Sequence, residues 1–127
     1  MKRFGFIIHM VMAGLFMTGC SKVSVNDLID TYWTGTCVST EYSEGQKDDL
    51  SIDFFTGKAD FTYLKYGEQY PETGVMLYEV SGQTLTLTKA NEILNGEWSI
   101  EYHKGKDMTL SRNQEGGTST ITLRKRR

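Results

Sequence analysis

Residues 78–88 read Tyr-Glu-Val-Ser-Gly-Gln-Thr-Leu-Thr-Leu-Thr, which is a strand, a turn and a second strand in succession. Apolar and polar side chains alternate on both sides of Ser81 and Gly82, and this is the period of a β-strand with one buried face. Gly82 tolerates the positive backbone φ that tight hairpin turns require. The stretch therefore predicts two adjacent antiparallel strands.

The same alternation, rich in Thr, Tyr, Phe, Ile and Val, continues through much of the chain and is interrupted by turn residues at short intervals. The eight expected strands cover residues 32–42, 50–55, 58–66, 74–80, 84–89, 97–103, 107–112 and 119–125. Because short connections join each strand to the next, we expect an all-β, up-and-down antiparallel meander.

Every expected strand has one apolar face, and an open sheet would leave these faces wet and two edges unpaired. Closure into a small eight-stranded barrel solves both problems, although two packed sheets are the alternative. A barrel of this size is filled by side chains or holds one small ligand. The inner-face aromatic residues, which are the ligand-binding candidates or else core, are Phe54, Phe61, Tyr63, Tyr78, Trp98 and Tyr102.

The N-terminus differs in composition from the rest of the chain. Lys2 and Arg3 precede an almost wholly apolar run over residues 4–17, as in secretory signal peptides. The run is shorter than the ~20 apolar residues of a transmembrane helix. Residues 17–20, Met-Thr-Gly-Cys, resemble the lipobox of bacterial lipoproteins. The resemblance implies cleavage before Cys20, lipid on its thiol and acylation of the new amine.

The expected organisation has three parts. They are a leader over residues 1–19 that is removed, a tether over 20–25 and a barrel domain over 26–127. Residues 26–30 are typical of one short helical turn with Asn26 as its N-cap. Because more than one acyl chain holds a membrane protein permanently, we expect a lipid-anchored protein on the periplasmic face of an outer membrane, with the cell surface as the alternative.

Several segments resemble bacterial lipocalin-like domains. They are residues 28–33, 78–88, 96–100, 108–111 and 121–124. The resemblance implies a lipocalin-like barrel in which Trp33 on the first strand contacts a basic residue of the last strand, Arg124 or Arg126. Lipocalins typically carry Gly two residues before this Trp, whereas this chain has Thr31 there.

Charge excludes one class of partner. Loss of Lys2 and Arg3 with the leader leaves 12 of the 14 basic residues against 16 acidic ones, a net charge of −4. Nucleic-acid binding needs a concentrated basic face, so no nucleic-acid partner is expected. The exception is residues 124–127, Arg-Lys-Arg-Arg. They are interpreted as a cation–π partner of Trp33, a solvated chain end, or a contact with anionic lipid.

Residues with catalytic chemistry are few in the mature chain. His103 is expected in a turn, and Cys37 as a small buried apolar group. Acidic residues such as Asp48 are expected in solvated loops. The sequence contains no metal-ligand spacing, nucleophile turn or phosphate-binding glycine motif. We therefore expect no catalytic residues, no metal and no cofactor.

The sequence thus predicts a non-catalytic, monomeric, membrane-anchored envelope lipoprotein whose lipocalin-like barrel binds a small apolar ligand. The alternative is an interaction module with a filled barrel that contacts an envelope protein or glycan, for which Phe55, Tyr66 and Tyr70 are candidate surface residues. Cavity volume separates the two, because a ligand site needs a few hundred Å³.

Overall fold

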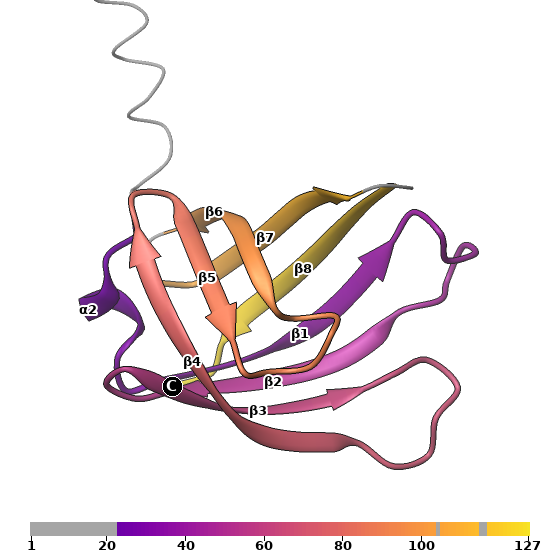
Figure 1. Ribbon diagram of the computed structural model, residues 1–127, viewed down its shortest axis with the longest axis horizontal. Helices are drawn as coiled ribbons and strands as arrows, with labels where there is room; N and C mark the ends of the chain where they lie inside the picture. Colours follow the sequence, from indigo (N-terminus) through magenta and orange to yellow (C-terminus); the bar gives the residue numbers. More distant parts are fainter. Residues whose placement is uncertain (1–22, 104, 115–116) are drawn as a thin grey trace, which may run out of the picture.

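Each strand is hydrogen-bonded to its neighbours in the sequence, and the last strand returns to pair with the first. The computed structural model describes residues 23–103, 105–114 and 117–127, so the expected leader and Cys20 lie outside the described residues. These residues form a closed antiparallel eight-stranded barrel, which confirms the expected fold class (Figure 1). The elements are α2 (Val25–Leu28), β1 (Thr31–Ser39), β2 (Asp48–Phe54), β3 (Lys58–Leu64), β4 (Glu72–Ser81), β5 (Thr84–Thr88), β6 (Gly96–His103), β7 (Asp107–Gln114) and β8 (Gly117–Lys125).

The seam between β1 and β8 closes the barrel. The two strands pair along β1 from Trp33 to Ser39. At Gly35 the backbones approach so closely that an added Cβ would lie 1.8 Å from the carbonyl oxygen of Thr122. Glycine is therefore required at this point of the seam, because any larger residue would push the strands apart.

Strand ends differ from the expected ones where turns or partner strands decide them. β1 ends at Ser39 because its carbonyl accepts from the N–H of Tyr42 and begins a turn. β2 begins earlier than expected, at Asp48, because this residue pairs with Cys37 of β1. β7 extends to Gln114, where the hairpin with β8 still pairs.

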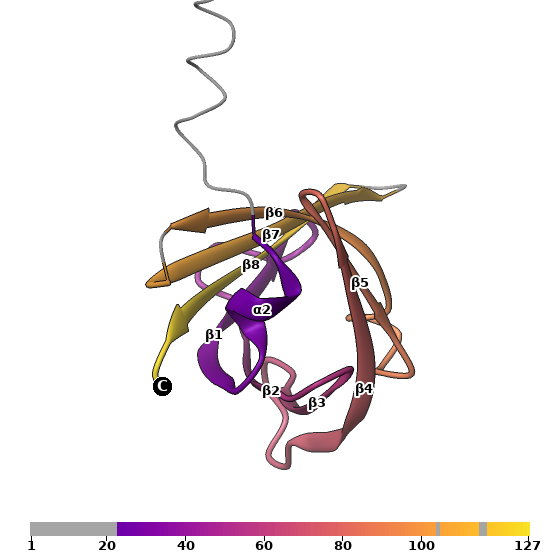
Figure 2. The ribbon, with the colours of Figure 1, turned by 90° about the vertical axis from the view of Figure 1, so that its left-hand side faces the viewer.

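One end of the barrel is covered by α2 (Figure 2). The expected N-cap, Asn26, is wrong, because the helical turn begins at Val25 and Ser24 occupies the cap position. The backbone N–H and the hydroxyl of Ser24 both donate to the carboxylate of Asp27, at 2.8 and 3.2 Å. Leu28 is fully buried and fixes the turn on the core.

The interior is packed with the inward side chains of the eight strands, which form one apolar cluster. Its largest fully buried members include Trp33, Trp98 and Phe54. We call the end covered by α2 the helix end. We call the opposite end the mouth, where loops 40–47, 65–71 and 89–95 connect the strands (Figure 1).

Candidate functional site

A buried carboxylate, that of Asp48, lies in the mouth and is only 1% exposed. The residue stands two positions before inward-facing Leu50, so the pleat of β2 directs its side chain into the barrel. The Tyr42 hydroxyl donates to both carboxylate oxygens at 2.8 and 3.0 Å, the Tyr63 hydroxyl donates to one, and the Tyr66 N–H donates at 2.8 Å. Three donors thus satisfy a group that is costly to bury alone.

The groups around Asp48 hold their protons strongly. Burial, followed by the hydrogen bond to Asp48, raises the pKa of Tyr42 from 10.0 to about 12. The same two causes raise the pKa of Tyr63 further. Burial also raises the pKa of the Cys37 thiol, and this outweighs the opposing effect of its hydrogen bond with Tyr63. Near neutral pH, Asp48 is therefore surrounded by neutral hydroxyls and a neutral thiol.

Arg112 of β7 fastens the loop over residues 89–95 to the barrel. Its guanidinium donates to the carbonyl oxygens of Asn95, at 2.5 Å, and of Ile93. The same group lies 4.2 Å from the ring centroid of Trp98, a cation–π distance. Burial lowers the pKa of Arg112. No pattern in the sequence indicates this contact, since Arg112 and its partners lie far apart in the chain.

A pocket of about 170 Å³ opens between these groups. Its polar lining includes Ser39, Glu41, Asp48, Glu92, Arg112 and Ser119. Sites for drug-sized ligands occupy roughly 300–1,000 Å³ and are mostly apolar. The mouth pocket therefore has room for a few waters or one small polar group of a ligand.

The six aromatic ligand-binding candidates all lie in the buried core. Phe54 and Tyr78 pack edge to face with ring centroids 4.9 Å apart. The Tyr78 hydroxyl donates to the carbonyl oxygen of Phe55, and the indole N–H of Trp98 donates to that of Leu94. Phe61 and Tyr102 are also buried, and Tyr63 reaches the Asp48 cluster. None of these six residues lines the mouth pocket.

The expected cation–π contact between Trp33 and the last strand is wrong. Trp33 is fully buried, whereas Arg124 is on the outer face with its side chain 67% exposed and 3.6 Å from Asp107. Arg126 donates to the hydroxyl of Thr34, also outside the barrel. In the described part of the chain, two arginines lie over aromatic rings. They are Arg112 over Trp98 and Arg127 over Tyr32.

His103 is exposed, and its Nε2 lies 3.6 Å from Glu101. Within the described ranges, no three His, Cys, Asp or Glu side chains come together as metal ligands would. Cys37 is buried as expected, but it faces the polar Asp48 cluster rather than a purely apolar core. In the same ranges, no helix is both long and apolar enough to cross a bilayer.

The chain was also compared with known proteins. Neither the protein-family models nor the curated proteins gave a match.

Proposed function

We propose that this chain is the precursor of a bacterial outer-membrane lipoprotein whose barrel is a non-catalytic interaction module for a protein of the envelope. The apolar leader and the lipobox-like residues 17–20 support the anchor. The packing of the interior supports an interaction role over the binding of an apolar molecule.

The filled interior is the observation that carries this role. The inward aromatic rings pack on one another and on aliphatic side chains in one buried cluster. An apolar ligand would have to displace them, and the mouth pocket of about 170 Å³ is small and polar. Binding is therefore expected at the surface of the mouth.

The buried polar groups of the mouth, Asp48 and Arg112, are already hydrogen-bonded within the protein. Asp48 has three hydrogen-bond donors, and Arg112 holds two loop carbonyls while it stacks on Trp98. Groups that are paired in this way stiffen the surrounding loops. This arrangement favours the presentation of a fixed rim over acid–base catalysis, which needs a group free to exchange a proton with substrate.

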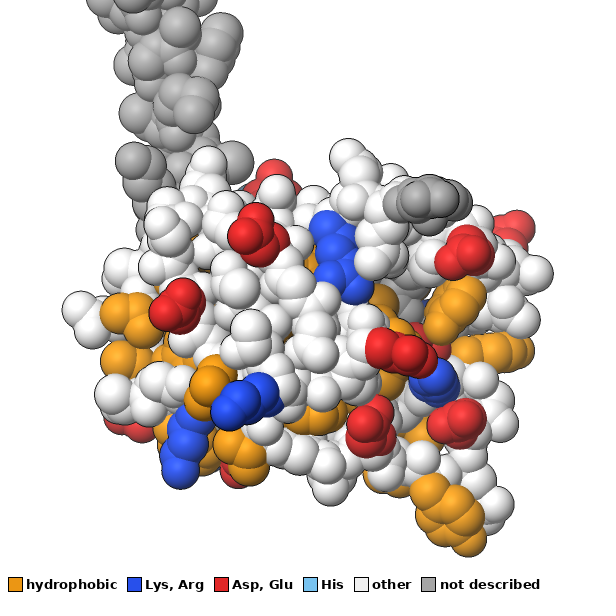
Figure 3. All heavy atoms as spheres, in the orientation of Figure 1, with side chains coloured by type: hydrophobic (Ala, Val, Ile, Leu, Met, Phe, Trp, Pro, Cys, Tyr) orange, Lys and Arg blue, Asp and Glu red, His pale blue; other side chains and the backbone are white. Residues whose placement is uncertain are grey.

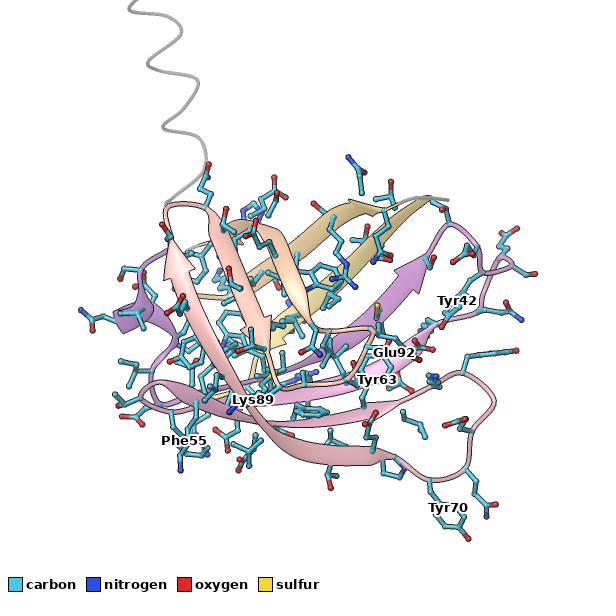
Figure 4. The ribbon with its side chains drawn as sticks, in the orientation of Figure 1. Tyr42, Phe55, Tyr63, Tyr70, Lys89 and Glu92 are labelled. Atoms are coloured by element: carbon cyan, nitrogen blue, oxygen red, sulfur yellow. The ribbon has the colours of Figure 1, made fainter. Side chains whose placement is uncertain are left out.

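The rim carries tyrosines and exposed carboxylates. Tyr66 and Tyr70 are 56% and 77% exposed on the loop over residues 65–71. Phe55, the third surface candidate, lies at the helix end, away from Tyr70 (Figure 4). Several acidic side chains lie on the mouth side of the surface (Figure 3). Glu41 and Glu92 are exposed and line the mouth pocket. Tyrosine is enriched at protein interfaces and opposite charges steer association, so the rim suits a basic partner surface.

The anchor is tested with a Cys20→Ser precursor in the native host. We expect wild type in the membrane fraction with an acylated N-terminal residue by mass spectrometry, and the variant without acyl chains and outside that fraction. A variant that remains acylated and membrane-bound in the wild-type form would show that the lipobox assignment is wrong.

The interaction role is tested by photocrosslinking in intact cells. A photoreactive phenylalanine analogue at Tyr70 should give a discrete protein adduct, whereas the same analogue at Glu79, on the outer face of β4, should not. Glu41→Gln with Glu92→Gln should lower the adduct yield, because the partner surface is basic. Equal adducts from both positions, or a yield insensitive to the rim charges, would refute the proposed mouth interface.

Glu79→Gln combined with Glu101→Gln is the matched control for the rim variant. It removes two exposed carboxylates from the outer faces of β4 and β6, away from the rim. We expect this control to leave the adduct from Tyr70 unchanged. A loss as large as that of the rim variant would mean that overall charge, not the mouth, governs the contact.

A further inference from the structure

The basic residues 124–127 are fixed to the barrel rather than left as a loose chain end. The N–H of Arg126 donates to the carbonyl of Tyr32 at 2.7 Å. The N–H of Lys125 donates to the carbonyl of Lys106 at 2.9 Å, which brings the β6–β7 turn alongside. Figure 2 shows that the end of β8 lies at the same end of the barrel as α2.

These basic side chains border one surface depression of about 460 Å³. Its lining, which we call the basic patch, is Gly105, Lys106, Arg124, Lys125, Arg126 and Arg127. Among the described residues, two carboxylates pair with the patch. Asp107 lies 3.6 Å from Arg124, and Asp53 lies 2.7 Å from Arg127. Five basic and two acidic side chains give the patch a net charge of +3.

The basic patch lies at the end of the barrel to which the proposed anchor is attached. Val23 packs in the core and is only 4% exposed, so it fixes the start of the described chain at the helix end. A chain advances at most about 3.6 Å per residue, which places Cys20 within about 11 Å of Val23. Acyl chains on Cys20 would therefore hold the helix end within about one Debye length of the lipid surface.

We propose that the basic patch binds the anionic phosphodiester headgroups of the membrane that anchors the protein, and that this contact turns the mouth away from the bilayer. The proposal rests on the lipid anchor of the proposed function. Guanidinium groups bind phosphate oxygens through paired, charge-assisted hydrogen bonds, and lysine adds a compact charge. An anionic membrane surface attracts basic side chains within a Debye length. Anchor and patch together then present the acidic rim to the periplasm.

Co-sedimentation with vesicles tests the patch without the anchor. The probe is the mature chain, residues 20–127, with Cys20→Ser, so that no acyl chain contributes to binding. We expect it to bind vesicles of equimolar phosphatidylglycerol and phosphatidylcholine, and to be released as salt screens the attraction. We expect no binding to phosphatidylcholine alone. Equal binding to both vesicles would overturn the proposal.

A pair of matched variants assigns the binding to the patch. Lys106→Gln with Arg126→Gln should weaken partitioning onto the anionic vesicles about 25-fold, at about five-fold per charge. Lys47→Gln with Lys89→Gln removes the same charge from positions outside the basic patch and should leave partitioning unchanged. Circular dichroism verifies that each variant is folded. An equal loss in both variants would mean that net charge alone drives binding, and the patch would be refuted.

The lipid anchor and the basic patch are tested by independent measurements. Mass spectrometry of the wild-type protein from membranes reports on Cys20, and the vesicle assay reports on the basic patch. Acylated Cys20 without a preference for phosphatidylglycerol overturns the patch and leaves the anchor. Unmodified Cys20 overturns the anchor, and with it the proposed orientation, whatever the vesicles show.

Discussion

Asp48 organises the mouth through three donors that come from different segments of the chain. In Asp48→Asn the amide keeps one acceptor oxygen and turns an N–H₂ donor toward groups that also donate. Because hydrogen bonds to charged groups are worth about 1.5–3 kcal/mol, we expect a loss of about 2–3 kcal/mol in the free energy of unfolding. Urea titration measures it.

Asp49→Asn is the control, because the next residue on β2 is exposed and the substitution is chemically the same. It should change stability by less than about 0.5 kcal/mol. Equal effects of the two substitutions would show that the buried hydrogen bonds are not the source of the loss.

The raised tyrosine pKa values predict alkaline sensitivity. The unfolded chain releases a proton from Tyr42 near pH 10, whereas the folded chain holds it until about pH 12. Stability from this group is therefore complete below pH 10 and falls as pH rises to about 12. Cys37, whose pKa is also raised, adds to the fall from about pH 9. Urea unfolding across this range should show a smaller decline for Tyr42→Phe, and an unchanged decline would contradict the assignment.

The sequence predicts which side chains point inward, but it does not predict which polar groups are buried. The inward positions of the aromatic candidates followed from the alternation, because pleat geometry fixes the parity of each strand. The same parity, counted back from Leu50, would have placed Asp48 inside. The carboxylate was instead expected in a loop, since burial of an acidic group depends on partners such as Tyr63 that only the folded chain brings near.

Thr31 stands where the lipocalin pattern that the sequence resembles has glycine, and its side chain makes two contacts. Its hydroxyl accepts from the indole N–H of Trp33 at 2.8 Å and donates to the carbonyl of Leu28 at 2.5 Å. A glycine at this position would have no side chain to supply either contact. The threonine therefore satisfies a buried tryptophan and ties β1 to α2.

The loop between β5 and β6 depends on one side chain from β7. In Arg112→Lys a single ammonium cannot reproduce both carbonyl contacts and the planar stacking on Trp98. We expect the amides of Leu94 and Asn95, which bond within the loop, to exchange with solvent at least ten-fold faster. Hydrogen exchange measured by NMR tests this.

Arg124→Lys provides the comparison, because Arg124 lies on the outer face and contacts Asp107 only loosely at 3.6 Å. Exchange of the loop amides should keep its wild-type rate in this variant. Acceleration in both variants would show that Arg112 has no special hold on the loop.

The β1–β8 seam predicts an unusually severe alanine substitution. In Gly35→Ala the new methyl group would stand 1.8 Å from the Thr122 carbonyl oxygen, so the strands must separate. We expect a loss of about 3 kcal/mol or more, or failure to fold, by thermal and urea unfolding. Thr36→Ala, the next residue of β1, should cost about 1 kcal/mol or less. A neutral Gly35→Ala would contradict the close approach.

Turns were easier to predict than strand ends. Gly57 and Gly82 have φ of 78° and 63°, values that favour glycine, so local sequence alone placed both hairpins. Strand ends are decided by what lies opposite, as where Asp48 pairs with Cys37. Such pairings join residues distant in sequence, and alternation within one segment does not reveal them.

At the scale of the whole molecule, the sequence predicted a closed barrel, but it did not decide whether the interior holds a ligand or is filled by side chains. The faces of the strands follow from alternation, whereas the space between them depends on how the closed sheet curves and on how side chains interdigitate. Trp33 and Trp98 are fully buried in that space, together with the other inward side chains of the core cluster. The filled interior therefore moves the expected site of binding from the inside of the barrel to its rim.

A barrel whose first strand pairs with its last is completed only when the final residues are present. Until β8 arrives, β1 and β7 both have unpaired edges, and the core lacks Ile121 and Leu123. A chain that threads through a translocation channel must stay unfolded while it passes. If the chain is exported as proposed, the topology would delay folding until β8 has crossed the membrane, and the arrival of β8 would end the period in which exposed strands could aggregate.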